Sequence, residues 1–260
     1  MSLAVCVLAS GSSGNCTYVG SEHTRILIDA GLSFREIETR LESIRVDPAT
    51  ISAVCVTHEH SDHTACLGVL QRRRNVSLYA NSGTIEAVEL TGKIKGLTWN
   101  VFSTGAPFTI GDLRLEPFSV PHDSYDPVGF VVACGPARVG IVTDMGIPTE
   151  LIRERLRRCQ VVVIEANHDE ELLKDSPRPW ALKQRIAGRQ GHLSNVRAGE
   201  LMADVAGDGL QTVFLAHMSE ECNRPELAFK TVARALSEKG HPDIVLKFTY
   251  PDRVSDRVEI

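Results

Sequence analysis

The most informative part of the sequence is Thr57-His58-Glu59-His60-Ser61-Asp62-His63, which places three imidazoles and two carboxylates within seven residues. It directly follows the apolar stretch 52–56, which is predicted to be a buried strand. A strand end followed by a tight loop can turn His58 and His60 toward one metal ion, and Asp62 and His63 toward a second. A surface loop that is rich in histidine by chance would not explain this position. We therefore expect two divalent metal ions, since this ligand set suits zinc, manganese or iron.

Three further residues of metal-binding type each follow a predicted apolar strand. His122 comes after the strand predicted near 113–120, Asp144 after 138–143, and His217 after 212–216. Layered α/β folds assemble their sites at the carboxyl ends of such strands. Each of these residues alone could be an ordinary structural residue, but together with 57–63 they complete two metal sites.

The composition indicates a globular chain that can bury its own core. With 260 residues, of which 43% are hydrophobic and 23% charged, we expect a single domain over residues 1–260. The apolar runs are much shorter than the roughly 20 residues that span a bilayer, and no signal-peptide pattern opens the sequence, so we predict a cytoplasmic protein without a membrane partner. Seven cysteines without a CxxC pair favour reduced, buried thiols. The net charge of -5 gives no overall attraction to nucleic acid.

Two successive halves share the same order of predicted elements. The first half has strands at 3–8, 17–19, 25–29, 52–56, 76–80, 99–102 and 113–120, with helices at 33–44, 65–73 and 82–90. The second has strands at 129–134, 138–143, 161–165 and 212–216, with helices at 149–158, 195–205 and 224–239. Such halves predict an α/β fold with two β-sheets packed face to face and helices outside, in four αββα layers.

The order HxHxDH, a later His, a strand-ending Asp and a last His resembles the signature of the metallo-β-lactamase superfamily, from Asp29 to His217. The resemblance implies two sets of ligands: His58, His60 and His122 for one ion, and Asp62, His63 and His217 for the other. Asp144 would bridge both ions. Asp29 would support the metal-binding loop without binding metal.

The resemblance also narrows the activity. True β-lactamases typically have a cysteine where this chain has Asp144, whereas an oxygen bridge is typical of the phosphodiesterase and thioesterase branches. The segment LASGSSGNC at 8–16 closely resembles the start of the YycJ/WalJ group, which is described as DNA exonucleases. It implies a 5′-to-3′ DNA exonuclease in which two Zn²⁺ or Mn²⁺ ions share a hydroxide, with DNA favoured over RNA as substrate.

Two later segments, 163–169 and 191–195, are similar to those of phosphodiester-cleaving relatives. By that similarity Glu165 orients His192, which contacts a phosphate oxygen or protonates the leaving group, while Asp62 can accept the water proton. Alternatively, His192 is a helix-start residue that bonds to the backbone. Ser194 could cap the following helix in either case.

The stretch 176–199 contains basic residues and no acidic one: Arg178, Lys183, Arg185, Arg189 and Arg197. Such a strip could hold a nucleic-acid backbone, and Trp180 could stack on a base. The candidate substrate contacts are His192, Ser194, Asn195, Arg185 and Arg189. The alternative is a solvated face in which Trp180 packs normally, and for His168 a solvated loop position is equally compatible with the sequence.

Other functions remain open at this level. The chain lacks the large inserted domain of bigger ribonucleases in the superfamily, so a small-molecule phosphodiesterase for cyclic or nucleotide-like diesters is the main alternative. A thioesterase and a metal-binding scaffold without activity are the others, and the Glu165 and His192 pair argues against the thioesterase. A homodimer is also compatible with the sequence.

Overall fold

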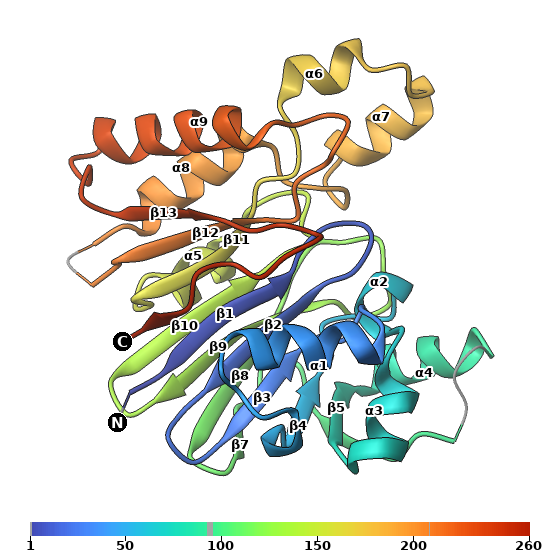
Figure 1. Cartoon of the computed structure of the whole chain (residues 1–260). Helices are drawn as coiled ribbons and strands as arrows, with labels where there is room; N and C mark the ends of the chain where they lie inside the picture. The colour runs from blue at the N-terminus through green and yellow to red at the C-terminus, as the bar shows by residue number, and fades with distance from the viewer. Residues whose placement is uncertain (1, 93–95, 208) are drawn as a thin grey trace. The chain divides into compact units, whose positions relative to one another are not determined.

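The computed structural model describes residues 2–92, 96–207 and 209–260, which form two compact units (Figure 1). Unit 1 comprises Met1–Ser119, Ser124–Ala137 and Tyr250–Ile260, and unit 2 comprises Val120–Asp123 and Arg138–Thr249. A single domain over residues 1–260 stays a prediction. No helix of the described ranges is long and apolar enough to cross a membrane.

Unit 1 contains a seven-stranded sheet in the order β14-β1-β2-β3-β4-β5-β6. Its strands are β1 (Ala4–Ala9), β2 (Cys16–Gly20), β3 (Arg25–Ile28), β4 (Ala53–Cys55), β5 (Ser77–Asn81), β6 (Trp99–Phe102) and β14 (Val258–Glu259). The pairs β14–β1, β1–β2 and β2–β3 are antiparallel, and β3 to β6 run parallel. The carboxyl ends of β3 and β4 therefore meet at one edge, where Asp29 and the 57–63 loop begin.

Three antiparallel strands of unit 1 face this sheet: β7 (Phe108–Ile110), β8 (Leu113–Ser119) and β9 (Val128–Cys134). The ring of Phe102 on β6 stacks on Phe108 at 5.0 Å between centroids and meets Phe130 edge-on at 5.6 Å. Offset and edge-to-face aromatic pairs add to the stability of a buried apolar layer. The sandwich arrangement is thus present within unit 1.

Helices cover the other face of the first sheet of unit 1. They are α1 (Phe34–Ser43), the short 3₁₀ helix η1 (Pro48–Thr50), α2 (Ser61–Thr64), α3 (Leu67–Arg74) and α4 (Ser82–Leu90). Ser33 begins α1 with a capping box to Glu36, and Ile37 and Leu41 pack into the core cluster that lines the sheet. Leu67 of α3 packs into the same cluster. The apolar residues of α1 and α3 that pack against the sheet are therefore buried.

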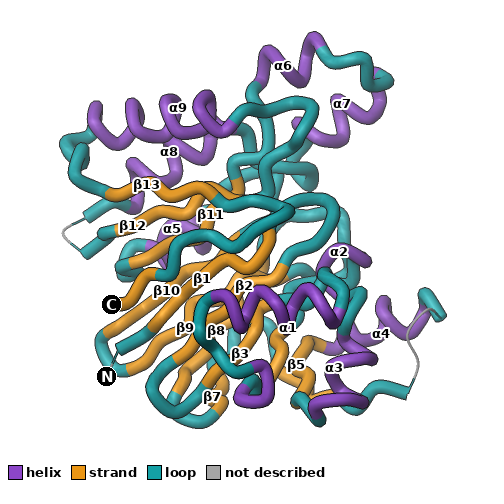
Figure 2. The backbone as a smooth tube through the Cα atoms, in the orientation of Figure 1, coloured by secondary structure: helices purple, strands orange, loops and turns teal. Residues whose placement is uncertain are grey.

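Unit 2 is a parallel α/β layer. Its strands are β10 (Ala137–Val142, from Arg138 in this unit), β11 (Val161–Glu165), β12 (Thr212–Ala216) and β13 (Val245–Phe248), and all pair in parallel. Its helices are α5 (Glu150–Leu156), α6 (Glu170–Asp175), α7 (Trp180–Ala187), α8 (Asn195–Val205) and α9 (Pro225–Glu238). Helices α8 and α9 lie side by side over the strands, and Phe229 of α9 contacts Phe248 of β13 (Figures 1 and 2).

The elements agree closely with those expected from the sequence, with differences of one or two residues at most ends. The unexpected elements of the described residues are β7, β13, β14, η1, α6, α7 and the short α2, which replaces part of the tight loop after 57. All seven cysteines are free and buried, in agreement with the prediction of buried thiols.

Candidate metal centre

In unit 1, Asp29 organises the histidine loop that follows β4. Its Oδ1 accepts a hydrogen bond from the backbone N of Thr57 at 2.8 Å, and its Oδ2 accepts one from Thr57 Oγ1 at 2.9 Å. Nδ1 of His63 lies 2.8 Å from the same Oδ2. A carboxylate only accepts, so Nδ1 of His63 carries the proton and Nε2 is the nitrogen that can bind a metal. Asp29 therefore supports the loop in the way that the resemblance implies.

Within this loop, potential ligand atoms lie in two close pairs. Nε2 of His58 is 3.1 Å from Nδ1 of His60, and Oδ2 of Asp62 is 3.4 Å from Nε2 of His63. Two nitrogen or oxygen atoms that bind the same tetrahedral zinc ion would lie about 3.3 Å from each other. The donor types and these spacings fit divalent metal ions.

Asn15 is a member of this cluster that residue-type reasoning missed. Its Nδ2 lies 3.2 Å from Asp62 Oδ2 and 3.1 Å from His63 Nε2, and its backbone N donates to the carbonyl of Asp62. At Gly31 a Cβ atom would collide with that same carbonyl oxygen, so only glycine fits there. The segment 8–16 therefore shapes the metal loop; the sequence marks it only through its resemblance to the YycJ/WalJ group.

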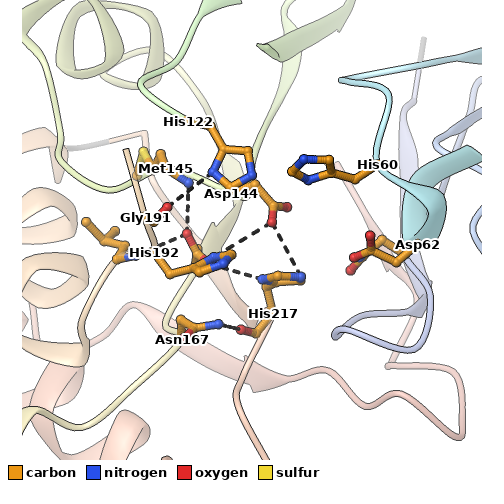
Figure 3. A network of polar contacts seen from close by, with 12 residues as sticks. His60, Asp62, His122, Asp144, Met145, Asn167, Gly191, His192 and His217 are labelled. Atoms are coloured by element: carbon orange, nitrogen blue, oxygen red, sulfur yellow. Dashed lines mark hydrogen bonds and ion pairs between the residues drawn. The ribbon is translucent and has the colours of Figure 1, made fainter. Parts of the chain in front are cut away.

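Unit 2 brings three predicted residues to the carboxyl ends of neighbouring parallel strands. Asp144 follows β10, Glu165 ends β11 and His217 follows β12. Asp144 and His217 both have left-handed backbone angles, with φ of 55° and 52°. Non-glycine residues rarely adopt this conformation, and such strain is concentrated at functional sites. Oδ1 of Asp144 lies 3.5 Å from Nε2 of His217 and 3.8 Å from Nδ1 of His192 (Figure 3).

Glu165 holds the two histidines of this cluster. Its Oε1 is 2.7 Å from Nδ1 of His192 and 3.0 Å from Nδ1 of His217, while Oε2 accepts from the backbone N of Met145 and Leu193. Burial would raise the pKa of Glu165, but the two histidines more than offset it and hold that pKa well below its usual range. Burial likewise opposes the charge on His192, yet Glu165 raises the pKa of this imidazole. The pair is therefore a buried carboxylate hydrogen-bonded to a half-buried imidazole whose charged form it favours.

His122 lies in the same unit, with its ring centroid 5.4 Å from that of His192. Nδ1 of His122 is 3.2 Å from the carbonyl oxygen of Gly191. Burial lowers the pKa of His122, so the ring favours the neutral form that binds metals. Four other residues of unit 2 each offer one ligand atom, and these atoms all lie within 4.8 Å of one another: Asp144, Glu165, His192 and His217.

Most of the other residues that were predicted to contact the substrate make hydrogen bonds or ion pairs within the protein. Ser194 caps α8 and donates to Glu170 Oε1 at 2.9 Å, and the buried amide of Asn195 pairs with Asn223 at 2.9 Å. Arg185 forms an ion pair with Asp123 at 2.6 Å, and Arg189 is exposed. A substrate contact from any of these residues stays a prediction.

The chain belongs to the β-lactamase superfamily, because residues 24–218 match the family model for the β-lactamase superfamily domain. It is 38% identical over 241 residues to the exodeoxyribonuclease YycJ of Bacillus anthracis, and the aligned region covers 92% of this chain and 91% of that relative. It is 35% identical over 260 residues to the exodeoxyribonuclease WalJ of Streptococcus pneumoniae serotype 2, covering 98% and 97%. These matches confirm the predicted relation to the YycJ/WalJ group.

The crystal structure of the metallo-β-lactamase fold protein YhfI from Bacillus subtilis matches with a TM-score of 0.76 at 14% identity, over 100% of both chains. This likeness confirms the predicted fold class, two packed β-sheets with helices outside.

Proposed function

We propose that this protein is a metal-dependent phosphodiesterase that degrades DNA as a 5′-to-3′ exonuclease. The observation that carries the proposal is the contact between Glu165 and His192 at the strand ends of unit 2, next to Asp144 and His217. A histidine kept protonated by a buried carboxylate suits a reaction in which a negatively charged oxygen leaves. The names of the YycJ and WalJ relatives support DNA as the substrate.

The proposed ligand assignment follows family membership. His58, His60 and His122 would hold one ion, Asp62, His63 and His217 would hold the second, and Asp144 would be the ligand shared by both. The spacings within each unit support this assignment, since ligand atoms occur in pairs 3.1–3.5 Å apart. Bound Zn²⁺ or Mn²⁺ ions would neutralise charge on the phosphate and make a water a better nucleophile.

The chain's own residues then orient groups and move protons. Asp29 keeps the proton on Nδ1 of His63 and so presents Nε2. Asp62 accepts the proton of the attacking water. Glu165 keeps Nδ1 of His192 protonated, and Nε2 of His192 donates its proton to the departing oxygen. Each proton thus has a named donor and acceptor.

Digestion of end-labelled substrates tests this proposal. Double-stranded DNA, single-stranded DNA, RNA and a chromogenic phosphodiester are incubated in Mn²⁺ or Zn²⁺ with the wild type, His60→Ala and the matched control His23→Ala. His23 is an exposed histidine of unit 1. We expect loss of nucleotides from the 5′ end of DNA with the wild type and His23→Ala, and none with His60→Ala.

Other outcomes would contradict the proposal in different ways. Cleavage of the small diester alone would move the protein to the small-molecule phosphodiesterases. Full activity of His60→Ala would remove the ligand assignment. Metal-loaded protein that cleaves no ester of any class would favour a scaffold.

A further inference from the structure

Unit 2 contains a pocket of about 400 Å³ that the proposed chemistry does not use. It is lined by His168 and by residues of α6, α7 and the start of α8. Its volume lies within the range of about 300–1,000 Å³ that is usual for small-molecule sites. None of the lining residues belongs to the proposed set of metal ligands.

The charge of the lining favours an anion. Three cationic side chains, Lys174, Lys183 and Arg197, line the pocket together with one carboxylate, Glu170. Oε1 of Glu170 already accepts a hydrogen bond from Ser194 Oγ at 2.9 Å. Arg197 is held in place because its guanidinium donates to the carbonyl of Gly146 at 3.0 Å. Lys183 is held as well, because its Nζ donates to the carbonyl of Lys174 at 2.5 Å, whereas Lys174 already pairs with Glu171 at 3.4 Å. Lys183 and Arg197 are therefore the cations placed to attract a phosphate group.

Trp180, the first residue of α7, gives the pocket an aromatic surface. Its side chain is 70% exposed, the largest exposed fraction among the large hydrophobic residues of the described ranges. An exposed indole beside cations is suited to stacking on a nucleobase whose phosphate contacts those cations. This arrangement accounts for an aromatic residue that does not pack in the core.

His168 provides a polar group that no neighbour satisfies. The residue is only 2% exposed, and within the described part of the chain its Nδ1 has no hydrogen-bond partner. Its backbone is fixed, because its carbonyl accepts from the N of Asn195 at 2.9 Å and the residue forms a β-bridge with Ser194. Buried polar atoms without a partner are rare, and imidazole can donate to or accept from a base edge or a sugar hydroxyl.

We propose that this pocket binds a nucleoside 5′-monophosphate unit, with the base on Trp180, the phosphate at Lys183 and Arg197, and His168 as a polar contact. The inference rests on the proposed function, because it assumes that the protein acts on DNA. The bound unit is either the terminal nucleotide of a strand or the mononucleotide that is released.

Binding is measured on the full chain in EDTA, so that the pocket is tested without metal ions. Deoxyadenosine 5′-monophosphate, deoxyadenosine and inorganic phosphate are titrated by calorimetry. The variants are Trp180→Ala and Lys183→Gln, with Leu90→Ala and Lys230→Gln as matched controls on exposed positions of α4 and α9. Because Trp180 and Leu90 are both largely exposed, neither substitution removes core packing.

We expect the nucleotide to bind more tightly than either fragment. Trp180→Ala should raise its Kd about five- to hundredfold, since stacking on an aromatic residue contributes that much per base. Lys183→Gln should weaken the binding of the nucleotide and of phosphate but not that of the nucleoside. Both control variants should bind all three ligands like the wild type. No nucleotide binding, equal effects of Trp180→Ala and Leu90→Ala, or equal affinity for phosphate and nucleotide would overturn the inference.

A 5′-phosphorylated oligonucleotide separates the two sources of the ligand. Binding that depends on Trp180 assigns the pocket to the strand terminus, whereas binding of the mononucleotide alone assigns it to the product. Digestion of labelled DNA by the same protein in Mn²⁺ separates this inference from the proposed function. DNA degradation without nucleotide binding overturns only the pocket, and nucleotide binding without DNA degradation overturns the proposed function.

Discussion

Replacing Asp29 with Asn tests how the histidine loop is held. Three donors converge on the Asp29 carboxylate: the backbone N and Oγ1 of Thr57 and Nδ1 of His63, at 2.8–2.9 Å. An amide of the same size has one acceptor oxygen, and its NH₂ group would face a donor. A hydrogen bond to a charged group contributes about 1.5–3 kcal/mol, and a buried donor left without a partner costs about 1–3 kcal/mol.

We therefore expect Asp29→Asn to lower the free energy of unfolding by about 2–4 kcal/mol, measured by urea denaturation in EDTA. Metal affinity should fall about 10–100-fold, because the partner that orients His63 is lost. The affinity is measured by calorimetric titration of metal-free protein with Zn²⁺.

Asp112→Asn is the matched control for this change. Asp112 is half-buried in the same unit and accepts a hydrogen bond from Ser21 Oγ at 2.8 Å, but it contacts no histidine of the loop. This variant should lose some stability and keep its metal affinity. Equal metal affinities of the Asp29 and Asp112 variants would refute the supporting role of Asp29.

Three further perturbations test other parts of the account. Glu165→Gln should reduce kcat on DNA about a hundredfold or more, since it removes the partner that keeps His192 protonated; a variant with the wild-type kcat and pH profile would contradict this. Burial lowers the pKa of His168 from 6.5 to about 4, so protonation favours the unfolded state and wild-type stability should decline as the pH falls from about 6.5 to 4. In His168→Gln the decline in the free energy of unfolding over this pH range should be smaller than in the wild type by up to about 3 kcal/mol, as measured by urea unfolding. Equal pH slopes for both proteins would count against a neutral buried imidazole. A thiol reagent should label almost no cysteine in the native protein and all seven after denaturation, because all are buried and burial raises the pKa of Cys6 to about 11; rapid native labelling would contradict the fold.

The sequence indicated where the candidate ligands lie in the fold, because their chemistry is concentrated at strand ends. His58, His60, Asp62 and His63 follow one apolar strand, and Asp144 and His217 follow two parallel strands, whose carboxyl ends must share an edge. These positions depend on local pattern and strand direction, both of which the sequence carries.

Other features depend on distant contacts that no local pattern contains. Asn15 reaches Asp62 and His63, more than 45 residues away, because β2 and β3 return the chain to the end of β4. Helix α7 was missed because two prolines precede it and no capping side chain marks its start. The pairing of Asn195 with Asn223 likewise removes an amide that the sequence alone presents as available.

The most direct test of a two-metal nuclease is to titrate metal-free protein with Mn²⁺ while following release of nucleotides from end-labelled duplex DNA. We predict no release in EDTA and a rate that rises to a plateau at two equivalents of metal per chain. Full activity without metal, or no activity at any metal ratio, would contradict the account.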